Sequence, residues 1–522
     1  MGRKFLRYCC AVALLSGTSL SASDLPLIEA AGTGDVAAVR SLLAQKGRVS
    51  EAGPDGTTAL HQAVRYDRLE VVNLLLAAGA DVKAATRYKV TPLSVACSNG
   101  NPAMIARLLD AGADPESTSG NGQTALMTAA LNGKPEAVKL LLARGAKVNL
   151  QEPVRGQTAL MWAAAEGNTA AAEMLIEFGA HVKTNSSTGF TPLLFAVRNG
   201  HKETVRALLA HGASANDTAP DGTSALNMAV LNAYFEVAAV LLEAGANPDA
   251  PDARGSALHT LAWLRKPGSD GGNGLGKRSY GVPQPLGHMT ALELAKVLLE
   301  HGANPNLVIQ MKEAVGNRDM AARSVPLITL GRHFLSFDGA TAFYIAARNG
   351  YAEYMRLLAE HGADPKKRNS LGITPLMVAS GLDYWEGETP GPYTGVSEAE
   401  RVEAVRLALE LGNEINATAD YCEYDMEGDP EYLLLYPPKN IATLAAKVPS
   451  DPRWSGSTAL HGAAVSGQPS IVKFLLERGA NPELKTKSGW TPLMMAGGTF
   501  FANARRDFPA AAAILRKAMA AR

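Results

Sequence analysis

Short apolar runs recur along this chain at a regular spacing, and each run begins with a threonine or serine. The first complete phrase is Thr58-Ala59-Leu60-His61. Similar phrases follow in steps of 33 or 34 residues at Thr91, Thr124, Thr158, Thr191 and Ser224, and further copies begin at Ser256, Thr341, Thr374, Thr458 and Thr491. A fixed period of this length indicates a repeat architecture, in which no single unit can bury its apolar face alone.

Each regular copy predicts two short helices. The threonine or serine stands where the first helix begins, so its hydroxyl can accept a hydrogen bond from an unsatisfied backbone N–H. A glycine such as Gly100 or Gly133 separates the two helices. The second helix carries a leucine pair such as Leu141-Leu142 and ends at the glycine of a Gly-Ala pair, which tolerates a left-handed backbone. A turn containing glycine, such as Asp221-Gly222, then leads into the next copy.

These phrases, threonine-proline-leucine or threonine-alanine-leucine followed by Leu-Leu-x-x-Gly-Ala, resemble the ankyrin repeat family. The resemblance covers nearly all of the chain after residue 23 and implies an all-α ankyrin-repeat solenoid of helix-turn-helix units with β-turn fingers. We count eleven copies plus a degenerate N-terminal capping unit over residues 24–45. Several copies replace the histidine of the phrase with methionine, leucine or asparagine, and we expect them to lose the polar network of that position.

Two of the steps are stretched to 85 and 84 residues by inserts. Residues 265–289 predict a glycine- and proline-rich loop inside one repeat, and residues 307–338 an elongated finger, interpreted as a β-hairpin. Residues 382–396 fall between the helices of the ninth repeat, and residues 422–454 separate it from the tenth. The predicted divisions are therefore repeats over 24–264, an interrupted repeat over 265–338, repeats over 339–421, and repeats with a capping helix over 455–522.

The first 23 residues have the organisation of a cleavable signal peptide. Arg3, Lys4 and Arg7 precede a short apolar core over 9–15, and small residues at 21–23 offer a cleavage site. This predicts a periplasmic or secreted protein. Crossing a bilayer takes about 20 apolar residues, and no later stretch is that long, so we expect no membrane span.

Charge and composition narrow the partner class. The chain carries 50 Lys+Arg against 50 Asp+Glu, whereas a nucleic-acid binder needs a basic surface that displaces counterions. We therefore expect no nucleic-acid partner. The glycines and lysine at 271, 276 and 277 match a phosphate-loop spacing, but Arg278 follows where serine or threonine is required and no strand precedes them, so we interpret this segment as a flexible linker.

Metal and catalytic sites also have structural alternatives. His61, His259 and His461 occupy the histidine of the repeat phrase, where the resemblance implies that the imidazole bridges neighbouring repeats. The acidic cluster over 425–429 lacks the spacing of a calcium loop, so a solvated loop is the simpler interpretation. We predict no catalytic residue, no metal site and no cofactor.

A protein-binding surface remains. In the ankyrin repeat family, partners dock on a concave face made by the turn tips and the exposed side of the first helices. Motif position assigns to that face Arg65, Tyr66, Arg87, Tyr88, Arg155, Phe190, Arg198, Arg348 and Trp490, and the insert at 382–396 adds Tyr384, Trp385 and Tyr393. Arginine and aromatic residues dominate interface energetics, although each could instead belong to an ordinary solvated surface. Trp162 and Phe195 are expected to pack inside the repeats.

The leading hypothesis is an exported, monomeric, non-catalytic scaffold that binds an unknown protein partner through this face, the inserts or both. The alternative is an enzyme or ligand-binding protein whose site is built by the inserts at 265–289, 307–338, 382–396 and 422–454. It requires titratable side chains from several inserts to converge in one pocket. A third hypothesis is an exported toxin or effector that acts in another cell.

Overall fold

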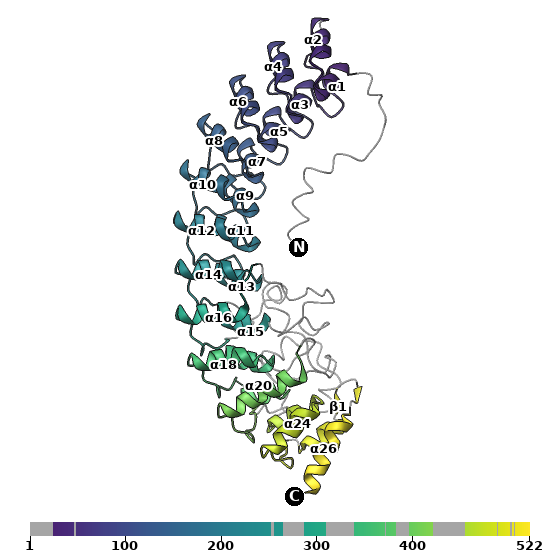
Figure 1. Cartoon of the computed structure of the whole chain (residues 1–522), viewed down its shortest axis with the longest axis vertical. Helices are drawn as coiled ribbons and strands as arrows, with labels where there is room; N and C mark the ends of the chain where they lie inside the picture. The colour runs from purple at the N-terminus through teal and green to yellow at the C-terminus, as the bar shows by residue number, and fades with distance from the viewer. Residues whose placement is uncertain are drawn as a thin grey trace, which may run out of the picture. The chain divides into compact units, whose positions relative to one another are not determined.

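The computed structural model describes residues 25–45, 49–251, 255–264, 287–309, 339–370, 372–382, 396–420, 455–487, 489–498, 500–501, 504–505 and 507–521. The chain forms two compact units, Met1–Pro220 and Asp221–Arg522, shown in Figure 1. We call them unit 1 and unit 2. None of the described helices is long and apolar enough to cross a bilayer.

Unit 1 is a stack of helix pairs. The pairs are α1 (Pro26–Thr33) with α2 (Val36–Ala44), α3 (Ala59–Arg65) with α4 (Leu69–Ala77), α5 (Pro92–Asn99) with α6 (Pro102–Asp110), α7 (Ala125–Leu131) with α8 (Pro135–Ala143), α9 (Ala159–Glu166) with α10 (Thr169–Glu177), and α11 (Pro192–Asn199) with α12 (Lys202–Ala210). The odd-numbered helices of this unit lie in one row and the even-numbered helices in another (Figure 1).

Unit 2 repeats the same pattern with interruptions. Its helices are α13 (Ala225–Leu231), α14 (Phe235–Glu243), α15 (Ala257–Leu264), α16 (Ala291–Glu300), α17 (Ala342–Arg348), α18 (Ala352–Glu360), α19 (Pro375–Ala379), α20 (Glu398–Glu410), α23 (Ala459–Val465), α24 (Pro469–Glu477), α25 (Pro492–Ala496) and α26 (Pro509–Ala520). The eleven predicted copies and the N-terminal capping pair are thus confirmed as helix pairs in the described chain. A two-stranded antiparallel ribbon, β1 (Phe500–Phe501) with β2 (Ala504–Arg505), lies between α25 and α26 and was not predicted.

The first residue of the repeat phrase caps its helix as predicted. The Thr124 hydroxyl accepts a hydrogen bond from the Met127 backbone N–H at 3.2 Å, and Thr191 accepts one from the Leu194 N–H at the same distance. Behind the cap, α7 buries Ala129 and Ala130 completely. These small side chains let the neighbouring first helices pack closely, so the core runs as a continuous layer between the two rows.

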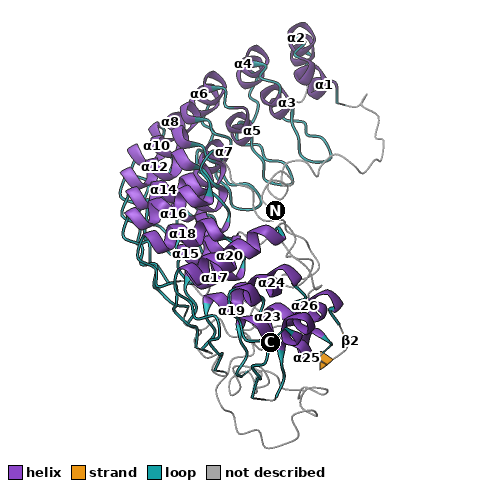
Figure 2. Cartoon of the chain, turned by 60° about the horizontal axis from the view of Figure 1, so that its bottom comes forward, coloured by secondary structure: helices purple, strands orange, loops and turns teal. Residues whose placement is uncertain are grey.

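Fingers connect one helix pair to the next. In the finger over residues 86–90, the backbone N–H of Thr86 donates to the Val90 carbonyl at 3.0 Å, and the N–H of Arg87 donates to the carbonyl of Asp55 in the preceding finger at 2.9 Å. The fingers of unit 1 extend from the first-helix row as the teal loops beside α3 and α5 in Figure 2. Backbone hydrogen bonds between successive fingers therefore hold the tips in register.

The histidine of the repeat phrase bridges neighbouring repeats, as the resemblance implied. The Nδ1 atom of His61 lies 2.9 Å from the Thr58 hydroxyl, and its Nε2 lies 3.0 Å from the Val90 carbonyl in the next finger. The expected loss of this network in the asparagine copy is wrong. Asn227 occupies the same position, and its side-chain amide donates to the carbonyl of Ala250 at 3.2 Å, so a hydrogen bond to the following finger persists through a different carbonyl.

The predicted inserts coincide with gaps in the described residues. Residues 265–286 and 383–395 lie between the helices of their repeats, and 310–338 and 421–454 lie between repeats; all four segments are outside the described residues. An isolated antiparallel bridge joins Val308 to Thr341 at the base of the second insert. Leu382 and Val396, the predicted ends of the third insert, are 2% and 3% exposed. These two residues belong to the core rather than to the insert.

Candidate functional site

The tip of the finger over 86–90 presents three large side chains to solvent. Arg87, Tyr88 and Lys89 are all exposed, and Tyr88 retains 54% of its accessible surface. The Arg87 guanidinium lies 4.8 Å from the centroid of the Tyr88 ring. Partial burial acts to raise the pKa of Asp55, but hydrogen bonds from Thr57 and the charge of Arg87 outweigh it and lower that pKa. The tip is thus a cation stacked on an exposed aromatic ring.

A second arginine–aromatic cluster joins a finger to its helix. The rings of Phe190, on the finger, and Phe195, on α11, lie 5.6 Å apart, and the Arg198 guanidinium lies 5.2 Å and 5.1 Å from their centroids. Phe195 is buried and Phe190 half-buried, while Arg198 is exposed. Desolvation beside the rings lowers the pKa of Arg198, but arginine stays charged at neutral pH. The cluster therefore places the Arg198 cation where the finger meets α11.

The finger over residues 152–157, which precedes the finger that carries Phe190, is organised by a buried acid. Glu152 is 4% exposed, and its carboxylate accepts hydrogen bonds from the backbone N–H groups of Val154 (2.7 Å), Arg155 (2.8 Å) and Gln157 (3.1 Å). Val154 stays 69% exposed and Arg155 is exposed. The carboxylate thus fixes the turn that presents an apolar and a cationic side chain.

Arg65 and Tyr66 complete this side of unit 1. Arg65 stands at the same place in its repeat as Arg198, seven residues after the capping threonine. Its guanidinium lies 5.9 Å from the Tyr66 ring, which is 52% exposed. We define the finger face of unit 1 as Arg65, Tyr66, Arg87, Tyr88, Lys89, Val154, Arg155, Phe190 and Arg198.

Three arginines of the second-helix row have carboxylate partners, while a fourth, Arg107 on α6, donates to the side-chain oxygen of Asn73 at 2.7 Å. Arg40, Arg144 and Arg206 lie 3.3, 2.6 and 2.7 Å from carboxylates of Glu70, Asp110 and Glu203, respectively. Among the described residues, no carboxylate lies within ion-pair distance of an arginine on the finger face. Those three second-helix arginines are therefore paired with carboxylates, whereas Arg65, Arg87 and Arg198 of the finger face rest on aromatic rings.

Arg348 does not share the exposed environment expected for it. It occupies the repeat position of Arg65 and Arg198, yet it is only 8% exposed, and its guanidinium lies 5.8 Å from the Trp263 ring centroid. Its neighbour Asn349 donates to the carbonyl of Ala262 at 2.9 Å. The tryptophan of the preceding repeat covers the position, so Arg348 packs in unit 2 rather than facing a partner.

The remaining predicted residues lie in unit 2 or outside the described chain. Trp490 is half-buried at the end of a finger, where its carbonyl faces Nε2 of His461 at 3.0 Å. Tyr384, Trp385 and Tyr393 are outside the described residues. The convergence of the four inserts that the catalytic hypothesis requires is therefore untested.

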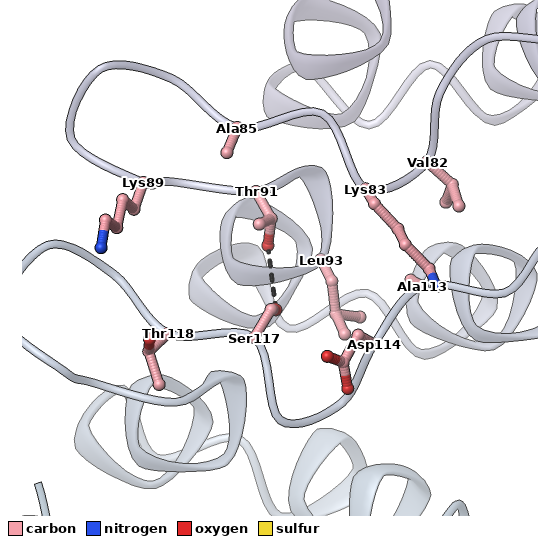
Figure 3. A pocket seen from close by; sticks show the side chains of 10 residues that line it. All are labelled: Val82, Lys83, Ala85, Lys89, Thr91, Leu93, Ala113, Asp114, Ser117 and Thr118. Carbon is pink, nitrogen blue, oxygen red and sulfur yellow. Dashed lines mark hydrogen bonds between the residues drawn. The ribbon is translucent and has the colours of Figure 1, made fainter.

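A groove of about 400 Å³ lies beside the finger over 86–90 (Figure 3). Lys83 and Lys89 stand at its two ends, and a hydrogen bond of 3.4 Å between the hydroxyls of Thr91 and Ser117 crosses its middle. Asp114 also lines it, and its carboxylate accepts the backbone N–H of Glu116 at 2.9 Å. In the described part of the chain, no three His, Cys, Asp or Glu side chains gather as metal ligands.

Three functional candidates were missed in the sequence. Lys89 carried a readable signal, because other copies have glycine at this position. Val154 and Glu152 carried none, since a finger glutamate ordinarily indicates a solvated charge.

Trp162 was expected to pack, and it is half-buried. Its Nε1–H is buried without an acceptor among the described residues, which is unusual for an indole.

Comparison with known proteins decides the family. A model of ankyrin repeats (3 copies) matches residues 6–86, 93–186, 178–252 and 431–499, and a model of a single ankyrin repeat matches residues 338–370. This chain belongs to the ankyrin repeat family. Ankyrin repeats generally mediate protein–protein interactions, and ankyrin repeat proteins are generally non-enzymatic scaffolds.

Individual relatives share only segments with this ankyrin repeat protein. SH3 and multiple ankyrin repeat domains protein 2 of Homo sapiens is 32% identical over 164 residues, covering 31% of this chain and 8% of that protein. Protein phosphatase 1 regulatory subunit 27 of Mus musculus is 37% identical over 81 residues, covering 15% and 53%. The chain therefore spans less than two thirds of either relative. The solved human ASB11 ankyrin repeat domain aligns with a TM-score of 0.39 at 28% identity, covering 43% of this chain and 99% of that one.

Proposed function

We propose that this ankyrin repeat protein is a non-catalytic scaffold that binds a protein partner through the finger face of unit 1. The observation that carries the proposal is the contrast between two sets of arginines in one unit. Arg40, Arg144 and Arg206 of the second-helix row have carboxylate partners, whereas three finger-face arginines lie over Tyr66, Tyr88 and Phe190. Arginine and aromatic side chains of this kind supply most of the energy at protein interfaces.

The exposed apolar surface supports the same face. Tyr66, Tyr88 and Val154 are three of the large hydrophobic side chains that stay exposed among the described residues. Exposed aromatic side chains that lie beside cations suit a partner which covers the ring and supplies the counter-charge. Because hydrogen bonds between successive finger backbones hold the tips, little ordering is needed when the partner binds.

The test compares two variants with the same change in charge. The finger-face variant is Arg65→Ala, Arg87→Ala and Arg155→Ala, and the control is Arg40→Ala, Arg144→Ala and Arg206→Ala in the second-helix row. Each chain, without residues 1–23, is immobilised and used to capture proteins from the extracellular or periplasmic fraction of its source. A captured protein is then purified and titrated against both variants.

The finger-face variant should bind the purified partner at least tenfold more weakly than the control variant. Circular dichroism should show equal helical content in both chains, since all six arginines are exposed. Equal binding by the two variants would place the partner elsewhere, and the proposal would then be wrong.

We further propose that the scaffold is exported and monomeric. The basic, apolar and small-residue segments over residues 1–23 support export. N-terminal sequencing of the protein from its source should find a chain that begins near Ala22 or Ser23. A chain that retains Met1 in a cytoplasmic fraction would exclude cleavage, and light scattering gives the mass in solution.

A further inference from the structure

Lys89 has a backbone conformation that other copies reserve for glycine. It has a φ of +57° and lies two residues before the capping Thr91. Nine other described fingers carry glycine at this position, each with positive φ: Gly56, Gly122, Gly156, Gly189, Gly222, Gly339, Gly372, Gly456 and Gly489. A side chain with a Cβ is strained in this region. The lysine is therefore a local departure from the repeat that costs stability.

Within the described part of the chain, no side-chain hydrogen bond or ion pair of Lys89 offsets this strain. The Lys89 side chain is exposed, and no ion pair with a carboxylate compensates it among the described residues. It extends from the finger at one end of the groove, and Lys83 extends at the other end (Figure 3). Strained backbone of this kind clusters at active sites and ligand clamps.

The charges around the groove define the ligand class. Of the charged residues that line the groove, two are the cations Lys83 and Lys89 and one is the acid Asp114, whose carboxylate already accepts a backbone N–H. The exposed Tyr88 ring lies between Arg87 and Lys89 in the chain. Such a surface complements an extended segment that carries carboxylates and at least one apolar side chain.

We propose that the finger over residues 86–90 and its groove bind an acidic, extended peptide segment of the partner, with Lys89 as the specificity-determining cation. This rests on the proposed function, because it names the chemistry of the partner that the finger face recognises. The Lys89 ammonium contacts a carboxylate at the finger end of the groove, and an apolar side chain of the segment covers Tyr88.

The test uses two fluorescent dodecapeptides of identical length. One has four glutamates and two leucines in a glycine-serine background, and the other has lysines in place of the glutamates. Binding to the chain without residues 1–23 is followed by fluorescence anisotropy at low and high salt. We expect the acidic peptide to bind at least tenfold more tightly than the basic one, and to weaken as salt screens the charges.

Two substitutions at one position then separate binding from stability. Lys89→Gly restores the residue of the other fingers, so it should raise the melting temperature while weakening the binding of the acidic peptide about tenfold. Lys89→Arg keeps the charge and should keep the affinity. Equal affinity of Lys89→Gly and the unaltered chain for the acidic peptide would overturn the proposal, as would equal binding of the two peptides.

Failure of this inference differs from failure of the proposed function. If the purified partner is lost from the finger-face variant but neither peptide binds, the scaffold function stands and the acidic-segment inference is wrong. If the acidic peptide binds through Lys89 but the purified partner binds both arginine variants equally, the groove is a real site and the proposed function is wrong.

Discussion

Nε2 of His461 lies 3.0 Å from the carbonyl oxygen of Trp490, one repeat further along the chain. Its Nδ1 faces the backbone N–H of Thr458 at 3.1 Å and must accept there, so Nε2 carries the proton and the ring is neutral. His259 has the same arrangement with Ser256 and Ala340. Neutral imidazoles therefore tie repeats of unit 2 together.

The first prediction follows from these imidazoles and concerns acid stability. Burial lowers the pKa of His259 and of His461 to about 4 in the folded chain, against 6.5 for an ordinary histidine. Between these values the unfolded chain binds more protons, so stability is complete above pH 6.5 and falls as the pH drops toward 4. Lowering the pH from 7.5 to 5 should reduce the free energy of unfolding by about 2 kcal/mol for each histidine. Denaturant unfolding at the two pH values measures the loss.

The control for this prediction is His461→Asn, which introduces the residue found at Asn227, where an amide bonds to the following finger without a titratable ring. This variant should lose about half of the pH dependence contributed by the two histidines. A variant that keeps the full slope would show that other groups cause the acid sensitivity.

The second prediction separates packing from binding in the Phe190–Phe195 pair. Phe195→Ala removes a ring that is 4% exposed and should reduce the free energy of unfolding by about 3–4 kcal/mol. Phe190→Ala removes a half-buried ring and should reduce the free energy of unfolding by about 1 kcal/mol, while weakening the binding of the partner. Urea unfolding and partner titration give both quantities. Equal losses of stability would mean that Phe190 is a core residue and no part of the finger face.

Comparison of Arg65 with Arg348 shows where sequence reasoning succeeded and failed. The start of each helix was predictable because Thr58 and Thr341 act on N–H groups within their own turn. The environment of the residue seven positions later was not, because Trp263 of another repeat covers Arg348, while Arg65 stays exposed. Periodicity gives the position of a side chain in its repeat, but burial depends on neighbours that differ between copies.

The finger face was predictable to a similar extent. Arg87, Tyr88 and Arg155 could be placed at finger tips by counting from the repeat phrase. Glu152 could not be recognised, because its burial depends on three backbone N–H groups turning toward it. Lys89 could have been recognised by comparing the copies, since a glycine position filled by lysine is visible in the sequence.

The third prediction uses the repeat-matched arginines. Arg348→Ala should lower the free energy of unfolding by about 2 kcal/mol, because it removes a buried cation stacked on Trp263. Arg65→Ala should change it by less than about 0.5 kcal/mol, since its side chain is exposed. Arg65→Ala should weaken partner binding, and Arg348→Ala should leave it unchanged. Weaker partner binding by Arg348→Ala at unchanged stability would restore Arg348 to the binding surface.

The last prediction concerns Glu152, whose side chain is buried. Glu152→Ala removes the acceptor of three backbone N–H groups and should destabilise unit 1 by about 2 kcal/mol. Because the carboxylate holds the turn that presents Val154 and Arg155, the variant should also bind the partner more weakly. Glu152→Gln keeps one oxygen acceptor and should fall between the two chains in both measurements. Hydrogen exchange at residues 152–157 reports the turn directly, and unchanged protection in Glu152→Ala would show that the fold holds this finger without its carboxylate.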